Sequence, residues 1–351
     1  MESWKRNVRE VEPYVPGEQP NIKGMIKLNT NENPYPPAPM VEEMEKKMDT
    51  NLFRLYPDPT ADRLVSALAS RYGLEKDQVF VGVGSDDVLA LSFLTFFNAK
   101  EPILFPDITY SFYDVWANLY RIPFETPALD DNFKIRVSDY KKKNGGIVIA
   151  NPNAPTSICE ELSFIREILD CNRDVVVIVD EAYIDFGGES AVSLIPEYDN
   201  LLVVQTFSKS RSMAGMRIGY AMGNQALIGA LLNVKYSFNS YTMNLPSILL
   251  GEQVIFDEAY FKETTDKIIK TREWTKLALS ELGFTFPDSK TNFLFVTHPS
   301  ILAGELFRML REKNIFVRHF NKPRIDNYLR ISIGTDQEME TLIKTLKEYV
   351  R

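Results

Sequence analysis

The sequence contains few of the residues from which metal sites and disulfide frameworks are built. Its 351 residues include only two cysteines and two histidines. Cys159 and Cys171 are too few and too far apart for a thiolate metal cage or a disulfide framework. His298 and His319 stand apart from each other, and neither lies in a metal-ligand pattern. We therefore expect no metal and two reduced thiols.

Long apolar runs and an excess of positive charge are also missing. No stretch is long enough to span a bilayer, and the N-terminal MESWKRNVREVEPY lacks the apolar segment of a signal peptide. The formal net charge is -8, whereas sequence-independent binding of nucleic acid needs a basic face. These absences predict a cytoplasmic protein that binds neither membranes nor nucleic acid.

The chain does contain a regular alternation of short apolar runs and helical patterns. Its length suggests two domains, and 44% hydrophobic residues is ordinary for a globular protein. Between residues 60 and 240, β-branched runs alternate with amphipathic segments, which favours a largely parallel α/β sheet. The runs are QVFVGV (78–83), PILF (102–105), GIVIA (146–150), DVVVIVD (174–180), LLVVQTF (201–207) and RIGYAM (217–222).

The two flanking regions have a different character. Residues 1–37 are proline-rich and read as an extended arm. A long helical pattern over 244–281 precedes the strand-like NFLFV (292–296), a helix (301–313), IFVR (315–318), YLRISIG (328–334) and a last helix in DQEMETLIKTLKEYV. We predict an arm with part of the small domain over 1–50, a large domain over 51–243, and a smaller α+β domain with a long connecting helix over 244–351.

Polar residues stand at the ends of several expected strands, where open α/β sheets bind ligands. The Gly-Ser-Asp turn at 84–86 suits a phosphate, or it only caps a helix. Asp180 ends the most apolar strand, where a carboxylate needs a cation or donors unless it faces water. Lys209 and Arg217 follow at the next turn. An ion pair explains this set almost as well as a cofactor, so spacing leaves the choice open.

Taken in order, these stretches resemble the fold-type I pyridoxal-phosphate enzymes of the aspartate aminotransferase superfamily. The resemblance covers nearly the whole chain and rests on NENPYPP (31–37), YPDP (56–59), GVGSDD (82–87), PDITYSFY (106–113), NPNAPTS (151–157), VDEAY (179–183), SKSRSMAGMRIG (208–219) and YLRISIG (328–334). It implies an α/β fold. A large domain has a mostly parallel seven-stranded sheet between helices, and a smaller α+β C-terminal domain and an N-terminal arm complete it.

The resemblance also assigns cofactor roles to residues that match the family's motifs. Lys209 would bond covalently to pyridoxal 5'-phosphate, Asp180 would keep its ring nitrogen protonated, and Tyr183 would donate to its ring oxygen. These three are the expected catalytic residues. The remaining cofactor contacts implied are Gly84, Ser85, Asp86, Ser208 and Arg217 at the phosphate, Tyr110 stacked on the ring, Asn153 near the ring oxygen, and Tyr56 reaching the neighbouring subunit of a homodimer.

One stretch departs from the family pattern. Many members read NPNNPTG, and the asparagine before PTG contacts the cofactor's ring oxygen, whereas here Ala154 takes that position and Ser157 stands where glycine is common. Either Asn153 or Asn151 takes over the contact, or Tyr183 makes it alone. One such hydrogen bond is worth about 1 kcal/mol, so its loss would tune cofactor binding and not abolish it.

The substrate residues implied by the resemblance are two arginines and a tyrosine of the arm. Arg330 matches the arginine that binds the substrate carboxylate, while Arg318 and Tyr14, with EPYVPG and NENPYPP, resemble the subgroup of histidinol-phosphate aminotransferases. Such enzymes move an amino group from a phosphorylated imidazole amino alcohol to 2-oxoglutarate, so these small molecules are the expected partners. The alternative to a substrate-binding role for Arg318 is that it is a surface residue at a strand end.

Three alternatives stay open at this point. One is an aminotransferase for aromatic or other amino acids, and another is a decarboxylase of phosphothreonine, whose relatives share many of these stretches. The third is a non-catalytic ligand sensor. It is disfavoured because no DNA-binding module precedes the arm in this sequence and because the net charge is negative.

Overall fold

The larger of the sheets explains where the polar strand ends meet. The computed structural model describes residues 3–350. All neighbouring strands run parallel except β8, which is antiparallel to both β2 and β7. In spatial order the strands are β2 (Val79–Gly82), β8 (Gly219–Gly223), β7 (Leu201–Thr206), β6 (Val177–Asp180), β5 (Ile147–Ala150), β3 (Ile103–Leu104) and β4 (Phe124–Glu125). The seven-stranded, mostly parallel sheet is therefore confirmed.

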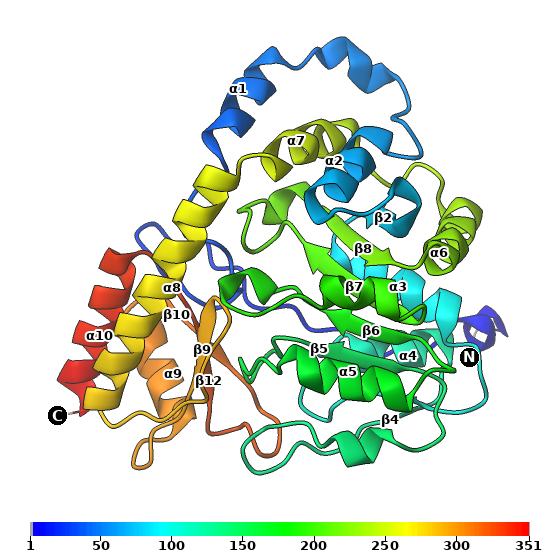
Figure 1. The fold of residues 1–351 in the computed structure, drawn as a ribbon. Helices are drawn as coiled ribbons and strands as arrows, with labels where there is room; N and C mark the ends of the chain where they lie inside the picture. The colour runs from blue at the N-terminus through cyan, green and yellow to red at the C-terminus, as the bar shows by residue number, and fades with distance from the viewer. Residues whose placement is uncertain (1–2, 351) are drawn as a thin grey trace.

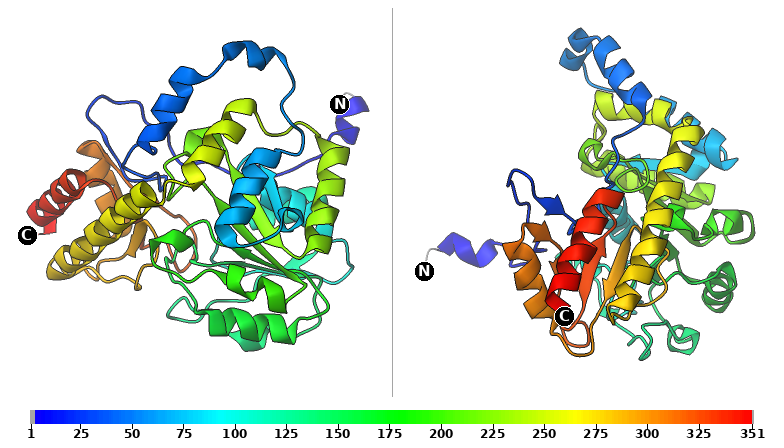
Figure 2. Two further views of the ribbon diagram at one scale, coloured as in Figure 1. Left: turned by 45° about the horizontal axis from the view of Figure 1, so that its top comes forward. Right: turned by 90° about the vertical axis from the view of Figure 1, so that its left-hand side faces the viewer.

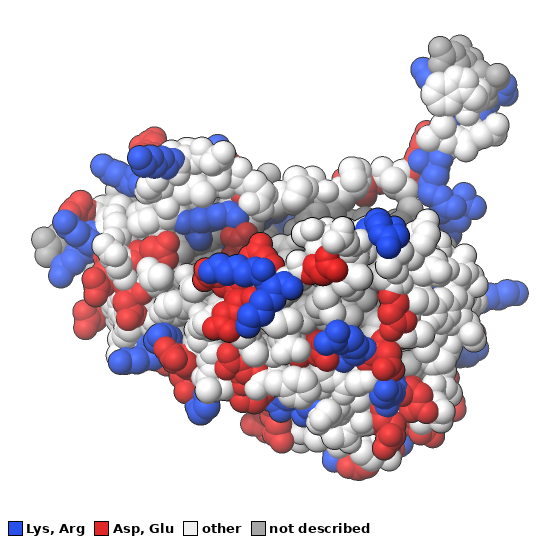
Figure 3. Space-filling view, turned by 90° about the horizontal axis from the view of Figure 1, so that it is seen from above, with Lys and Arg blue, Asp and Glu red and all other residues white. Residues whose placement is uncertain are grey.

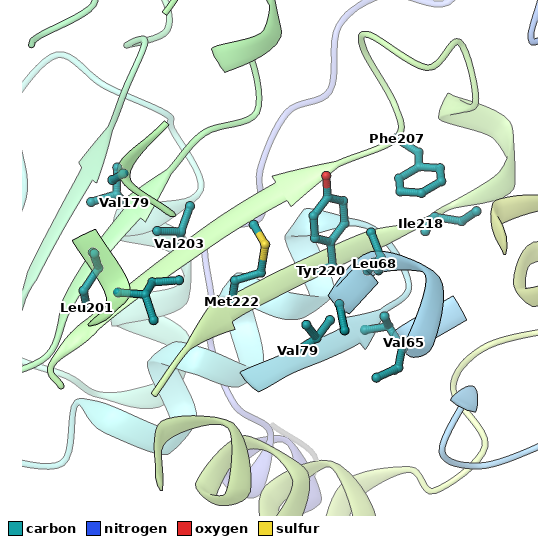
Figure 4. Packing of buried hydrophobic residues seen from close by; sticks show 14 of the residues in the cluster. Val65, Leu68, Val79, Val179, Leu201, Val203, Phe207, Ile218, Tyr220 and Met222 are labelled. Carbon is teal, nitrogen blue, oxygen red and sulfur yellow. The ribbon is translucent and has the colours of Figure 1, made fainter. Parts of the chain in front are cut away.

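Helices cover both faces of this sheet because its strands are apolar on both sides (Figure 1). Alternate residues of β5 show the division, since Ile147 and Ile149 belong to one buried cluster and Val148 and Ala150 to the other. Figure 4 shows the first cluster, in which side chains from β6, β7 and β8 meet those of α2. Its helices are α2 (Asp62–Tyr72), α5 (Leu162–Cys171) and α7 (Leu245–Ile255), and those of the second are α3 (Ser85–Phe96), α4 (Tyr113–Tyr120) and α6 (Gln225–Phe238).

The C-terminal part forms a smaller antiparallel sheet covered by helices. Its strand order is β11 (Arg318–His319), β12 (Leu329–Ser332), β9 (Phe293–Val296). A separate parallel pair joins β1 (Ile26–Lys27) to β10 (Ile315–Phe316), so the N-terminal segment is anchored on this part. The helices are α8 (Glu258–Glu281), α9 (Ala303–Glu312) and α10 (Asp336–Val350), and α8 lies beside α10 in both views of Figure 2.

The N-terminal segment stands partly away from the body. The helix η1 (Ser3–Asn7) projects outward, and the chain then runs without regular structure toward β1 (Figures 2 and 3). Basic and acidic side chains alternate over the face drawn in Figure 3. After β1 come α1 (Pro39–Lys47) and η2 (Thr50–Arg54), and the other short helices are η3 (Lys76–Gln78), η4 (Val137–Tyr140), η5 (Ile184–Phe186), η6 (Ala191–Glu197) and η7 (Ala214–Met216).

Three details differ from the sequence-based expectation. The long helical pattern over 244–281 is two helices, because Asp257 caps a new helix by accepting from the Tyr260 N–H at 3.2 Å. The IFVR stretch is divided between β10 and β11, and β4 was not expected at all. The helix α7 packs on the core of the large sheet. The three-part division of the chain stays a prediction. No helix among residues 3–350 has both the length and the apolar character needed to cross a membrane.

Candidate active site

A cavity of about 290 Å³ lies at the carboxyl ends of the parallel strands, between the large sheet, the small sheet and the N-terminal segment. This is the edge at which open α/β sheets bind ligands. Most of the expected site residues line it: Tyr14, Ser85, Asp86, Tyr110, Asp180, Tyr183, Ser208, Lys209, Arg217, Arg318 and Arg330. The fold therefore brings together residues that are spread over most of the sequence.

One end of the cavity is built for an anion. Helix α3 begins there, with Gly84 as its N-cap at a φ of 87°, and the Arg217 side chain lies beside this N-terminus. A Cβ at Gly84 would lie 2.3 Å from an Arg217 nitrogen, so only glycine allows this approach. The nearest carboxylate, Asp86, is 3.5 Å from Arg217. The guanidinium is not tightly neutralised and, with Ser208 beside it, fits a phosphate.

The opposite end holds a buried carboxylate. Asp180 is the last residue of β6 and is 5% exposed. Burial raises the pKa of its carboxyl to about 6, although hydrogen bonds from Tyr113 and from the Ala182 N–H lower it. The Tyr113 hydroxyl donates to Asp180 at 2.8 Å and is itself fully buried. Among the described residues Asp180 forms no ion pair, although the charge of Lys209 acts on it, and a protonated ring nitrogen would supply a direct cationic partner.

Lys209 lies between these two ends. Its Nζ donates to the Thr30 carbonyl oxygen at 3.3 Å and lies 5.7 Å from the centre of the Tyr183 ring. The Asn33 amide donates to the carbonyl oxygens of Lys209 and Ser210, which holds the backbone of the lysine in place. The amine therefore reaches into the cavity from a fixed backbone, as a nucleophile or base requires.

The tyrosines of the cavity differ in their contacts. Tyr110 lines the cavity and donates to Asp86 at 2.8 Å, which ties its hydroxyl to α3. Burial raises the pKa of Tyr110 well above its ordinary value. Tyr14 of the arm stacks on Phe112 with ring centres 4.1 Å apart. That stacking fixes the arm over the cavity and brings Tyr14 to its lining.

Two arginines face each other on the small sheet. Arg318 and Arg330 are direct partners across the antiparallel pair β11–β12, where like charges are unfavourable. Arg330 donates to the Asn29 carbonyl oxygen at 3.0 Å, while its buried Nε has no hydrogen-bond partner among residues 3–350. Burial lowers the pKa of Arg330, and the charge of Arg318 adds to that shift. An anion in the cavity would satisfy both cations.

Three expected residues do not line the cavity. Gly84 contributes the helix cap beside it. Asn153 uses its amide inside the loop, where it donates to the Ile108 carbonyl and to Thr156 and accepts from Thr109. Tyr56 is 83% exposed and stacks on Tyr241 at 4.7 Å, away from the cavity of its own chain.

Several residues of the site were not recognised from the sequence. Tyr113, Thr30, Asn31 and Asn33 all contact the expected residues. Asn31, Asn33 and Tyr113 lie inside NENPYPP and PDITYSFY, stretches that carried the resemblance without a role for each position, and Thr30 directly precedes the first of them. An extra signal was available, because such a dense run of polar residues beside prolines is unusual for a structural turn.

The NPNAPTS loop predicts a stability effect. Ser157 has a φ of 65° and is fully buried, and its hydroxyl has no hydrogen-bond partner in the part of the chain that the structure describes. Ser157→Gly should raise the free energy of unfolding by about 1 kcal/mol, because it relieves a left-handed residue and an orphaned hydroxyl. Ser157→Ala removes the hydroxyl alone and should gain less. Denaturant unfolding of the three proteins checks this, and a lower midpoint for Ser157→Gly would contradict it.

No group of three His, Cys, Asp or Glu within residues 3–350 is placed to hold a metal ion.

Comparison with known proteins points to one family. Residues 23–346 match the model described as aminotransferase class I and II. A histidinol-phosphate aminotransferase of Clostridium botulinum is 54% identical over 347 residues, covering 99% of this chain and 98% of that protein. One of Lactococcus lactis is 53% identical, with coverage of 99% and 97%.

Solved structures show the same fold. The histidinol-phosphate aminotransferase of Clostridium acetobutylicum superposes with a TM-score of 0.85 at 23% identity, covering 93% of this chain and 99% of that one. That of Sinorhizobium meliloti, in complex with pyridoxal-5'-phosphate, gives a TM-score of 0.82 at 23% identity, with coverage of 93% and 91%.

Proposed function

The chain belongs to the aminotransferase class I and II family, which depends on pyridoxal phosphate, and from that premise we propose that it converts L-histidinol phosphate and 2-oxoglutarate to imidazole-acetol phosphate and L-glutamate. Relatives with this activity in their names match it over nearly the full chain at about half identity. The structural observation that carries the proposal is the pair of arginines, Arg318 and Arg330, opposed across two strands beside the cavity.

The cavity fits the cofactor at both ends. The N-terminus of α3, Ser208 and Arg217 would hold the phosphate, because each offers a donor or positive charge. Asp180 would hold a proton at the ring nitrogen from its buried position. Gly84 leaves no side chain in the way of Arg217. Tyr110 would lie against the ring face, since its ring lines the same space.

The chain's own residues would perform the proton transfer. When bound, pyridoxal phosphate supplies an electron sink for the charge that develops at the substrate Cα. Lys209 Nζ would take the proton from that Cα, and its fixed backbone keeps the amine within the cavity. The arm and the small sheet cover the cavity and limit the access of water.

The two arginines suit both halves of this reaction. One substrate carries a phosphate ester, and the other carries two carboxylates. Arg318 and Arg330 are both partly exposed and both line the cavity, so two guanidiniums are available at one place to anions of different size. Phe320 lies 5.8 Å from the Arg318 guanidinium and 5.7 Å from that of Arg330, and it covers the pair from one side.

Removal of Arg318 should separate phosphorylated from unphosphorylated donors. A charged hydrogen bond is worth roughly 1.5–3 kcal/mol, so Arg318→Ala should lower kcat/KM for histidinol phosphate by about ten- to a hundredfold. It should lower kcat/KM for phenylalanine much less, if the enzyme uses that donor. Steady-state assays with 2-oxoglutarate measure both. Arg308→Ala, at an exposed position of α9, removes the same charge away from the cavity and serves as the control.

The alternatives give different results in the same assays. Equal losses on both donors would mean that Arg318 supports the fold or the arm. A wild-type preference for phenylalanine or tyrosine, with little change in Arg318→Ala, would favour an aromatic aminotransferase. Release of carbon dioxide without a need for 2-oxoglutarate would favour a decarboxylase.

A homodimer with shared active sites is part of the proposal. Large hydrophobic side chains are exposed around Tyr56, and the stacking of Tyr56 on Tyr241 joins residues from two parts of the chain. Exposed apolar patches of this kind mark interfaces. They comprise Leu52, Phe53, Leu55, Tyr56, Tyr236, Phe238 and Tyr241. Tyr56 would then reach the cofactor phosphate of the partner subunit. A cytoplasmic location stays a prediction.

A further inference from the structure

The hydroxyl of Tyr183 is held by a residue with no role assigned so far. The side-chain amide of Asn31 donates to it at 3.0 Å. A tyrosine hydroxyl can accept one hydrogen bond and still donate its own proton. Since Asn31 occupies the acceptor side, the O–H of Tyr183 remains free to donate to another oxygen in the cavity, which both residues line.

Asn31 is itself fixed from three directions. It is 1% exposed, and its φ of 56° lies in the left-handed region that asparagine tolerates. Its side-chain oxygen accepts from the Ser332 hydroxyl at 3.0 Å, and its N–H donates to the same hydroxyl at 2.9 Å. Its carbonyl accepts from Asn292 at 2.9 Å. The amide that meets Tyr183 therefore has one orientation.

Other groups near Tyr183 do not offer this contact. Ala154 lines the cavity but carries no polar side-chain atom. The Asn153 amide is used inside its own loop. The Asn151 amide donates to the Glu160 carbonyl at 3.0 Å, and its oxygen accepts from the Glu160 N–H at 2.7 Å. Both neighbouring asparagines are thus committed elsewhere.

We propose that Asn31 is a positioning residue for Tyr183, which orients the tyrosine O–H toward the cofactor's ring oxygen and makes good the missing amide at position 154. The inference rests on the proposed cofactor site. A hydroxyl that accepts a hydrogen bond becomes a stronger hydrogen-bond donor itself. Ser332 also lies two residues after Arg330 on β12, so both side chains point to one face of the strand. Asn31 therefore links Tyr183 to the strand that carries the anion-binding arginine.

The test uses the absorbance of the bound cofactor. We expect the pH midpoint of its absorbance change to rise by roughly 0.5–1 unit in Asn31→Gly. A weaker donor at the ring oxygen leaves more negative charge on that oxygen, and this charge favours the protonated form of the bound cofactor. Glycine keeps the left-handed backbone. Ser332→Ala, which frees the Asn31 amide to rotate, should shift the midpoint in the same direction by less. Asn153→Ala should leave the midpoint in place.

A double-mutant cycle separates positioning from a general structural role. Tyr183→Phe should raise the midpoint on its own, and adding Asn31→Gly to it should then produce no further shift. An additional shift in the double variant would overturn the inference, as would an unchanged midpoint in both Asn31→Gly and Ser332→Ala. A shift in Asn153→Ala without one in Asn31→Gly would do the same. Failure of the proposed function is distinct, because a protein that binds no cofactor shows no such absorbance.

Discussion

The Lys209→Ala variant should bind pyridoxal phosphate and lose turnover by a factor of at least 10²–10⁴, the range that general base catalysis contributes. The proposed phosphate contacts of α3, Ser208 and Arg217 would not involve the lysine, so cofactor affinity should fall without vanishing. Single-turnover assays and equilibrium dialysis measure the two properties. Lys270→Ala, at an exposed position of α8, should behave as wild type.

Reduction with borohydride gives an independent check of the same residue. The pyridoxyl group should be recovered on the peptide that contains Lys209. The competing candidate is Lys235, which is 2% exposed and whose pKa is lowered by burial. Its Nζ, however, donates to the Pro59 carbonyl at 2.7 Å and does not line the cavity. A label on Lys235 would therefore refute the assignment of the site.

The Asp180→Asn variant should have two opposite effects. Turnover should fall strongly, because a neutral amide cannot hold the ring nitrogen protonated. In the cofactor-free protein, by contrast, the same change should be stabilising at pH 8. Burial raises the pKa of Asp180 from 3.8 to about 6, so the ionised carboxylate is less favourable in the folded chain than in the unfolded one. The difference corresponds to about 3 kcal/mol at most.

The pH dependence follows from the direction of that shift. Below pH 3.8 the carboxyl is largely protonated in both states and this contribution to stability is fully present, whereas it is lost as pH rises through 6. Asp180→Asn should therefore match wild type at low pH and exceed it by about 1–3 kcal/mol at pH 8. Denaturant unfolding of the cofactor-free proteins measures this. Asp266→Asn, an exposed acid paired with Lys262, is the control and should change stability little.

Equal stability of Asp180→Asn and wild type at pH 8 would show that the buried carboxylate is not costly in the empty site. Near-normal single-turnover rates in the same variant would show that Asp180 is only a structural acid. The first result would contradict the predicted cost of burying the carboxylate, and the second would contradict its proposed role at the ring nitrogen.

The fold and the ends of the site were predictable from local sequence. Asp180 ends one apolar run and Lys209 stands two residues after another, and strand ends of a parallel sheet meet at one edge. The contacts that complete the site were not predictable. Asn31 and Tyr183 lie 152 positions apart, and Tyr113 and Asp180 lie 67 apart. Such pairs depend on how two sheets and a loop are placed, which no local pattern contains.

The observed strands are shorter than the apolar runs that predicted them. The run over 174–180 forms a strand only over Val177–Asp180, and the run over 201–207 forms one over Leu201–Thr206. An apolar run shows that residues are buried, and buried residues also lie in the turns beside a strand. The break at Asp257 was missed because a capping residue competes with helix periodicity, and periodicity alone does not show which of them prevails.

Because it includes residues beside the antiparallel strand β8, the proposed anion site is completed late in the synthesis of the chain. The insertion of β8 between β2 and β7 brings Arg217 to the start of α3, although Asp86 and Arg217 are 131 positions apart. At a synthesis rate of 5–20 residues per second, roughly ten seconds pass between synthesis of the start of α3 and synthesis of Arg217. Until then β2 has no partner within this sheet. The proposed anion site can therefore be complete only after Arg217 and β8 have been made.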